Sequence, residues 1–185
     1  MTTRRQQLLD IAAEAFARRG FHGVSVTDLG AAAGISGPAL YKHFPSKDSI
    51  LAEMLVSISE ELLAVGRSRA AAAAEEGPRA ALAALVEWHV DFALAHKALI
   101  IVQDRDWSSL PDDARDTVRG LQRDYVDLWA HTLRELQPEV TLDRARATVH
   151  ATFGLINSTP RSARVPDAEM RELLAEMAMR ALDAA

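Results

Sequence analysis

The sequence predicts an all-α protein of about nine helices, in which an N-terminal three-helix domain precedes a larger C-terminal helical domain. Three observations support this fold class. Apolar residues recur at helical spacing in most long segments. No segment alternates between apolar and polar residues with a period of two, and glycine or proline interrupts the pattern between segments. We place the domain boundary after residue 50, so that residues 1–50 and 51–185 form separate domains.

The first domain is expected to contain a helix over about residues 3–19 and then two short helices within residues 24–50. Gly34 ends the first short helix, because glycine accepts the left-handed backbone that a helix stop requires. Thr27 is expected to cap that helix, and Ser36 the next one, through their hydroxyls. This layout is that of a helix-turn-helix, whose second helix lies in the DNA major groove.

Three separated motifs in this stretch resemble the N-terminal domain of TetR-family repressors. They are GFHGVSVT at residues 20–27, AGIS at 33–36 and LYKHFPSK at 40–47. The similarity covers about residues 4–55, and the rest of the chain is similar to the family only in length and helical pattern. The resemblance implies a dimeric regulator that binds DNA through its first domain and a small-molecule effector through its second. An alanine-rich helical hairpin without DNA-binding activity is the alternative interpretation.

Side-chain chemistry and the resemblance together assign the DNA-contacting residues. Hydroxyl, imidazole and ammonium groups suit phosphate oxygens, and residues near the start of the recognition helix suit base edges. Lys42, a thymine methyl contact of Ala39 and DNA shape are expected to supply specificity, because glycine and alanine make no bidentate base contact. The expected phosphate contacts are Thr27, Tyr41, His43 and Lys47, and the expected base-side positions are Ser36, Gly37, Ala39 and Lys42, with Pro38 in the same helix.

The charge distribution agrees with DNA binding by the first domain alone. The formal net charge is −5, yet residues 1–50 hold six Lys/Arg and four Asp/Glu, a balance of +2, which leaves −7 for residues 51–185. The absence of cysteine excludes disulfides and thiolate metal sites and favours a cytoplasmic location. We expect no cofactor and no metal. We also expect no membrane partner, since the chain shows no signal peptide and no apolar run of about 18 residues.

Further helices are expected after the helix-turn-helix, separated by proline-containing breaks. Residues 67–78 contain an alanine run and then Glu-Glu-Gly-Pro, and we expect them to form a connection. Residues 159–166 are expected to form a loop. The recognition helix and the later helices are expected at about residues 38–44, 46–67, 78–96, 98–106, 111–136, 141–158 and 167–182.

Aromatic and polar residues on the middle helices predict an effector pocket. A pocket lined by aromatic side chains with a few polar groups is the usual small-molecule site, although aromatic residues at helical spacing also form plain core. The effector is expected to be mostly apolar, such as a lipid-like acid or an acyl thioester, with Arg105, Arg161 or Arg164 meeting a carboxylate or phosphate. The expected ligand-binding residues are Trp88, His89, Phe92, Arg105, Trp107, Tyr125, Trp129, Phe153 and Asn157.

The last two long helices are apolar on more than one side, which predicts a dimer interface. One apolar stripe serves the core of the single chain, and the excess suggests a partner surface. Small residues allow close helix approach. The expected interface residues are the small row Ala147, Ala151, Gly154 and Ser158, together with Met170, Leu174, Met177 and Ala181. The alternative is that all of these residues belong to an internal core.

These observations favour a ligand-responsive transcriptional repressor that binds a palindromic operator as a homodimer and is released by its effector. Three alternatives were weighed. A metal site at His89 and His96 needs further ligands, because two helix turns separate the histidines. An enzyme is disfavoured, because the chain lacks a nucleophile elbow, a phosphate loop and a dinucleotide-binding motif. A helical ligand-binding protein of the same fold that no longer regulates transcription is the remaining alternative.

Overall fold

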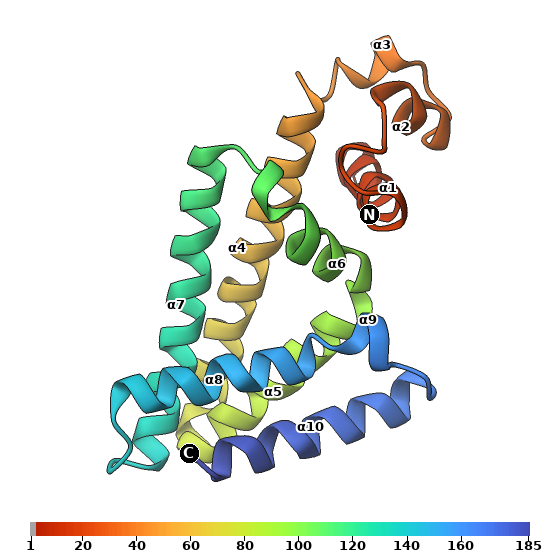
Figure 1. Ribbon diagram of the computed structural model, residues 1–185. Coiled ribbons are helices and arrows are strands. Elements are labelled where there is room, and N and C mark those ends of the chain that lie inside the picture. The colour runs from red at the N-terminus through yellow and green to blue at the C-terminus, as the bar shows by residue number, and fades with distance from the viewer. Residues whose placement is uncertain (1–2) are drawn as a thin grey trace. The chain divides into compact units, whose positions relative to one another are not determined.

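The computed structural model describes residues 3–185, and all of its regular structure is helical (Figure 1). Within this range the chain forms ten α-helices and two 3-10 helices and no β-strand, which confirms the predicted all-α class. The helices are α1 (Arg4–Arg19), α2 (Val26–Ala32), α3 (Gly37–Leu40), α4 (Lys47–Ala73), η1 (Ala74–Glu76), α5 (Pro78–Ala95), α6 (Lys97–Asp106), η2 (Trp107–Ser109), α7 (Asp112–Leu136), α8 (Leu142–Ile156), α9 (Thr159–Ser162) and α10 (Asp167–Asp183).

The chain forms two compact units whose limits differ from the boundary expected at residue 50. The first unit contains the chain up to Ile58 together with Ala98–Val118, and the second contains Ser59–Lys97 and Arg119–Ala185. The later segment joins the first unit because Val102, Leu110 and Val118 are buried in the same apolar core as α1. Helix α4 therefore contributes its first part to one unit and its second part to the other.

The helix-turn-helix begins at a capping box formed by Ser25 and Asp28, and the cap expected at Thr27 is wrong. The Ser25 hydroxyl accepts a hydrogen bond from the Asp28 N–H at 3.1 Å, and the Asp28 carboxylate accepts one from the Ser25 N–H at 2.8 Å. Ser25 is therefore the cap of α2, and Thr27 lies inside the helix, because the acidic residue three positions after Ser25 completes the box. The cap predicted at Ser36 is confirmed, since its hydroxyl accepts from the Ala39 N–H at 3.3 Å.

The turn between α2 and α3 depends on Gly34. This residue has a φ of 67°, a left-handed conformation that glycine adopts without strain, as the sequence predicted. The recognition helix itself is shorter than expected, because α3 ends at Leu40 and residues 41–43 form turns. Leu40 and Phe44 are buried at 2% and 1% exposure and anchor this segment to the core of the first unit.

The second unit is a layered helical domain. Helix α10 packs against α5 and α8, and Figure 1 shows these three helices lying side by side. The connection expected from residue 67 is wrong, since α4 continues to Ala73 and η1 follows. Alanine has the highest helix propensity, and the run at residues 70–74 extends the helix until Gly77 ends it. Within the loop expected at residues 159–166, residues 159–162 form the one-turn helix α9.

No helix in the part of the chain that the structure describes is both long enough and apolar enough to cross a bilayer.

Candidate functional site

The recognition segment presents a set of expected DNA-contacting side chains to solvent. Tyr41 is 52% exposed, which is unusual for a large aromatic residue without a partner surface. Lys42 is also exposed, and so are Thr27, Ser36 and Pro38, whereas Gly37, Ala39 and His43 are half-buried. With Leu40 and Phe44 directed into the core, the intervening positions face outward, where a phosphate or base edge can meet them.

Lys47 differs from the other expected phosphate contacts, because its side chain turns back onto the first unit. Its ammonium donates hydrogen bonds to the carbonyl oxygens of Phe21 at 2.8 Å and Val24 at 3.0 Å. It also lies 4.2 Å from the centre of the Phe21 ring, a distance at which cation–π attraction operates. In this structure Lys47 therefore fixes the segment that leads into α2.

Arg5 is bound inside the first unit in the same way. Its guanidinium forms a bidentate ion pair with Glu53 of α4 and donates to the His43 carbonyl. It also lies 4.3 Å from the centre of the Phe44 ring. Arg4 donates to the Ala33 carbonyl at 2.8 Å. These arginines hold α1 against the helix-turn-helix.

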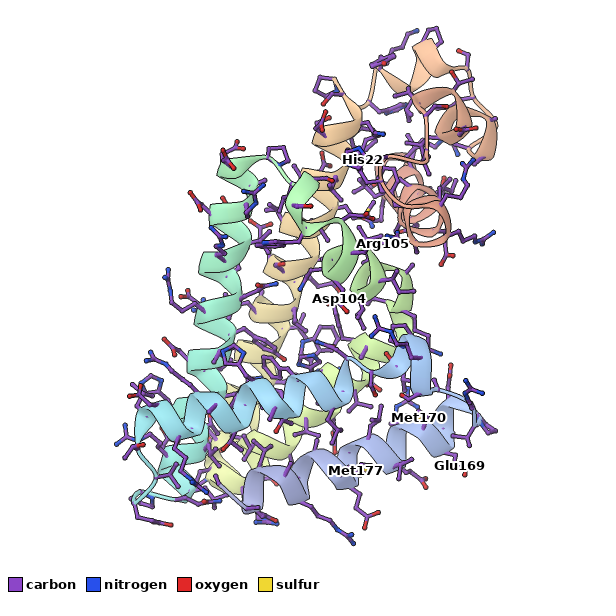
Figure 2. The ribbon with its side chains drawn as sticks, in the orientation of Figure 1. His22, Asp104, Arg105, Glu169, Met170 and Met177 are labelled. Carbon is purple, nitrogen blue, oxygen red and sulfur yellow. The ribbon has the colours of Figure 1, made fainter. Side chains whose placement is uncertain are left out.

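Arg105 lies in the first unit, apart from most of the expected ligand-binding residues. Figure 2 shows it on α6, and its guanidinium donates to the Ala17 carbonyl at 3.1 Å and to the Phe16 carbonyl. Phe16 and Ala17 belong to the last turn of α1, where unpaired carbonyls favour a cation. The same guanidinium pairs with the buried carboxylate of Asp106 at 3.1 Å. Trp107 is half-buried against the core of this unit as well. The structure thus gives Arg105 and Trp107 places in the first unit.

The other expected ligand-binding residues lie together in the second unit. We call His89, Phe92, Tyr125, Trp129 and Phe153 the aromatic cluster. His89 and Phe92 come from α5, Tyr125 and Trp129 from α7, and Phe153 from α8. The ring centre of His89 lies 4.4 Å from that of Phe153 and 5.8 Å from that of Trp129, and the Trp129 and Phe153 centres are 5.0 Å apart.

Trp88 and Asn157 lie at the edge of the aromatic cluster and have hydrogen-bond partners. The Trp88 indole N–H donates to the Leu62 carbonyl of α4 at 3.0 Å, and its ring centre is 6.0 Å from that of Phe92. The Asn157 amide oxygen lies 3.1 Å from Nε2 of His89. An amide oxygen only accepts, so Nε2 carries the proton and Nδ1 of His89 carries a lone pair.

Three polar atoms inside the aromatic cluster have no hydrogen-bond partner. They are Nδ1 of His89, the hydroxyl of Tyr125 and Nε1 of Trp129, on side chains that are 2%, 3% and 0% exposed. Buried polar groups are nearly always paired, and each unpaired one costs about 1–3 kcal/mol. Such groups gathered in one place are typical of a site that a ligand completes.

Burial keeps the aromatic cluster uncharged. It lowers the pKa of His89 to about 4, because the imidazolium would lose its hydration, although the hydrogen bond with Asn157 opposes part of this change. Burial also raises the pKa of Tyr125, and the nearby indole N–H of Trp129 opposes part of the rise, although the two groups do not meet the geometry of a hydrogen bond. At neutral pH the imidazole and the phenol are therefore both neutral.

Gly66 of α4 belongs to this site and was missed by the sequence interpretation. A Cβ atom at this position would lie 2.6 Å from Cε2 of Tyr125, so only glycine allows the Tyr125 ring to lie against the helix at this distance. A lone glycine inside a long helical pattern was the available signal. Through this contact the aromatic cluster touches the helix that both compact units share.

The expected dimer residues separate into an exposed and a buried group. Ala147, Ala151 and Gly154 are exposed on α8, and Met177 is 44% exposed on α10. Ser158 and Ala181 are half-buried. Met170 and Leu174 are 4% and 2% exposed and belong to the core of the single chain, whereas Leu173, which was not in the expected set, is 45% exposed. Figure 2 marks Met170 and Met177 on α10.

The alternative of a metal site finds no support in the described part of the chain. Residues 3–185 contain no group of three or more His, Cys, Asp or Glu side chains that could hold a metal ion. His89 uses one nitrogen for Asn157, and the ring of His96 lies 4.7 Å from that of Phe92.

A helix-turn-helix with an exposed recognition segment, in a chain that continues into a second helical unit, defines a class of protein, the helix-turn-helix DNA-binding transcriptional regulators. The chain belongs to the TetR family within that class. The family described as "Bacterial regulatory proteins, tetR family" matches residues 8–54, and the "Tetracyclin repressor-like, C-terminal domain" matches residues 75–182. This membership agrees with the interpretation of the sequence as a regulator rather than an enzyme.

A curated relative and two solved structures are similar to the chain. The HTH-type transcriptional repressor KstR2 of Rhodococcus jostii is 35% identical over 131 residues, which are 70% of this chain and 63% of the relative. The alignment thus spans less than two thirds of that repressor. A TetR-family regulator from Bordetella parapertussis superposes with a TM-score of 0.86 at 24% identity, covering 96% of this chain and 93% of the other. AibR, solved with isovaleryl coenzyme A and operator DNA, has a TM-score of 0.70 at 16% identity, covering 95% and 97%.

Proposed function

We propose that this TetR-family protein is a ligand-responsive transcriptional repressor that binds a palindromic operator as a homodimer and leaves it when a small, mostly apolar effector binds. The observation that carries this proposal is the pairing of two features in one chain. One is the solvent-exposed recognition segment around Tyr41 and Lys42, and the other is the buried aromatic cluster with its unpartnered polar atoms.

The DNA contacts that we propose follow from exposure. Thr27 and Tyr41 offer hydroxyls to phosphates, and His43 offers an imidazole. Lys42 is the cation best placed for DNA, because it is exposed and no intramolecular partner holds it in the way that carbonyl oxygens hold Lys47. Ala39 adds an apolar contact suited to a thymine methyl, and DNA shape supplies the remaining specificity.

Homodimerisation is supported by the exposed apolar face of the second unit. Leu173 and Met177 are 45% and 44% exposed on α10, and the small residues Ala151 and Gly154 are exposed on α8, against which α10 packs. Small residues allow a partner helix to approach closely, and exposed apolar side chains gain from burial at about 25 cal/mol per Å². A dimer places two recognition segments on one DNA duplex, which requires a palindromic operator.

The effector acts through α4 in this proposal. The helix carries Gly66 against Tyr125 of the aromatic cluster and carries Lys47 at its other end, beside the segment that leads into α2. A ligand that moves Tyr125 therefore presses on a helix that continues into the DNA-binding unit. The binding of isovaleryl coenzyme A, an acyl thioester, to AibR supports an acyl-thioester or lipid-like effector here. A regulator of promoters acts on DNA in the cytoplasm, which is the location that we propose.

The test is a selection of binding sites from random duplex DNA with the purified protein at two salt concentrations. We expect a palindromic motif whose affinity falls steeply with salt, because phosphate contacts release counterions. Failure to enrich any motif at low salt, from protein shown to be folded and dimeric, would contradict the proposal. That result would favour a helical ligand-binding protein of the same fold that no longer regulates transcription.

A further inference from the structure

The three unpartnered polar atoms of the aromatic cluster lie on three rings that pack close to one another. The ring centres of His89 and Tyr125 are 5.7 Å apart, those of His89 and Trp129 are 5.8 Å apart, and those of Tyr125 and Trp129 are 5.9 Å apart. Three rings at these distances are close enough together for one small ligand to contact all of them.

The polar atoms specify which hydrogen bonds a ligand must make. Nε1 of Trp129 only donates, and Nδ1 of His89 only accepts, because Nε2 of His89 carries the proton towards Asn157. The Tyr125 hydroxyl can donate or accept. A complementary ligand therefore needs one hydrogen-bond donor for His89 and one acceptor for Trp129, and either type of group can pair with Tyr125.

The surroundings favour an uncharged ligand group. His89 and Tyr125 are neutral because of their burial. A carboxylate placed among the five rings would lose its hydration, which costs far more than burying a neutral group. The guanidinium of Arg69 lies at the edge of the cluster, 5.2 Å from the centre of the Trp88 ring, rather than among the five rings. Arg105, which the sequence interpretation offered to a carboxylate, is bound to Asp106 and to carbonyl oxygens of α1 in the other unit.

Phe153 packs against all three rings. Its ring centre lies 4.4 Å from that of His89, 5.4 Å from that of Tyr125 and 5.0 Å from that of Trp129. It is half-buried, whereas the other four members of the cluster are buried. Phe153 is therefore the ring that a ligand displaces to reach the polar atoms.

We infer that the aromatic cluster binds an uncharged, mostly apolar ligand that carries a hydroxyl and a carbonyl group, with the hydroxyl donating to His89 and the carbonyl accepting from Trp129. This inference rests on the proposed function, since it names the chemistry of the effector at the same site. The uncharged acyl part of a thioester is compatible with it, whereas the head group of a free fatty acid is not.

The first test compares three probes of similar size on the full chain. They are 2-hydroxyacetophenone, which carries a hydroxyl and a carbonyl; mandelate, which carries a carboxylate; and ethylbenzene, which has no polar group. Tryptophan fluorescence and the shift in Tm report binding. We expect 2-hydroxyacetophenone to bind roughly tenfold more tightly than either of the others, or better, since each hydrogen bond to a buried polar group contributes about one such factor.

Variants then connect binding to the named atoms. Tyr125→Phe and His89→Phe should each weaken the binding of 2-hydroxyacetophenone roughly tenfold. Tyr125→Phe should also raise the Tm of the free protein by about 2–4 °C, because it removes a buried hydroxyl that has no partner. Thr159→Val is the matched control. Its buried hydroxyl donates to the Ala93 carbonyl at 3.0 Å, so its loss should lower the Tm.

Several results would overturn the inference. One is binding of mandelate that equals or exceeds that of 2-hydroxyacetophenone. Another is unchanged affinity for 2-hydroxyacetophenone in both Tyr125→Phe and His89→Phe. The third is that 2-hydroxyacetophenone binds neither the native chain nor Phe153→Ala, in which the displaced ring is already removed. Selection of DNA sites separates this failure from that of the proposed function. A palindromic motif without probe binding would overturn only the inference about the ligand. Probe binding without any motif would overturn the proposed repressor function, while the ligand site in the aromatic cluster would stand.

Discussion

The first unit and the aromatic cluster use polar groups in opposite ways. In the first unit Arg5, Lys47 and Arg105 donate to backbone carbonyl oxygens, and each also contacts a carboxylate or an aromatic ring. In the aromatic cluster the polar atoms of Tyr125 and Trp129 are buried without a partner. The comparison shows that cationic side chains fix the helices of the first unit, where Nε of Arg115 is the unpaired buried atom, whereas the aromatic cluster gathers three unpaired polar atoms in one place.

This difference has an energetic consequence. Hydrogen bonds from charged groups contribute about 1.5–3 kcal/mol each, whereas an unpaired buried polar group costs about 1–3 kcal/mol. A protein retains such a cost where function requires it, and a ligand that supplies the missing partners recovers it on binding.

The largest expected effect is the pH dependence that His89 imposes on stability. Its pKa in the folded state is about 4 against an ordinary 6.5, so between these values the unfolded chain binds a proton that the folded chain does not. The contribution of neutral His89 to the free energy of unfolding is therefore fully present above pH 6.5. Below that pH it falls by about 1.4 kcal/mol per pH unit, and by about 3 kcal/mol in all at pH 4. Urea denaturation across this range measures it. His89→Phe should remove this slope, whereas exposed His131→Gln should keep it.

Arg105→Met is expected to destabilise the protein by about 2–3 kcal/mol. The change leaves the buried Asp106 carboxylate and the Ala17 carbonyl at the end of α1 without their partner. Arg18→Met is the matched control, because Arg18 is exposed and pairs only with Glu14 on the same helix. Loss of ligand binding in Arg105→Met without loss of stability would contradict this structural role and show that Arg105 belongs to the ligand site.

Two lysines near the helix-turn-helix should respond differently to the same change. Lys47→Met should lower the free energy of unfolding by about 2 kcal/mol, because two hydrogen bonds and a cation–π contact are lost. Lys42→Met should leave stability within about 0.5 kcal/mol and reduce the salt slope of DNA binding by about 1. A reduced slope in Lys47→Met would show instead that the ammonium leaves the carbonyls to contact a phosphate.

The smallest expected effect is that of Gly66→Ala. The added methyl would clash with the Tyr125 ring and lower the free energy of unfolding by about 1–3 kcal/mol. Because alanine favours a helix over glycine by about 1 kcal/mol, we expect the net loss of stability to be about 1 kcal/mol. Gly120→Ala on α7 is the control, because a Cβ atom there meets only the far end of the Arg123 side chain, at 4.0 Å. Equal stability changes in the two variants would contradict the close contact between α4 and Tyr125.

The sequence predicted local features well and the direction of side chains less well. The turn at Gly34 and the cap at Ser36 follow from the chemistry of single residues, and both are confirmed. The cap of α2 was misplaced because Ser25 and Thr27 are both good caps, and only Asp28 distinguishes them. Helical spacing predicted an apolar stripe on α10, but spacing alone does not tell that Met170 faces the core of the single chain and Leu173 faces solvent.

The candidate sites show the same limit. Aromatic residues of α5, α7 and α8 were expected to gather, and the structure brings them together. Arg105 and Trp107 were expected to join them because they too lie in the middle of the chain. In the structure α6 packs with α1 instead, and no local sequence pattern predicts this long-range contact. Likewise, a lysine at a helix start suits a phosphate, and only the folded structure shows that carbonyl oxygens bind Lys47 first.

The link between the two regions is tested most directly by titrating 2-hydroxyacetophenone into the free protein and into its complex with a selected operator. Because coupling between two sites is reciprocal, operator DNA should weaken probe binding by the same factor by which the probe weakens DNA binding, about 5–150-fold. Equal probe affinity in the presence and absence of operator would contradict the account, since the aromatic cluster would then not control the helix-turn-helix.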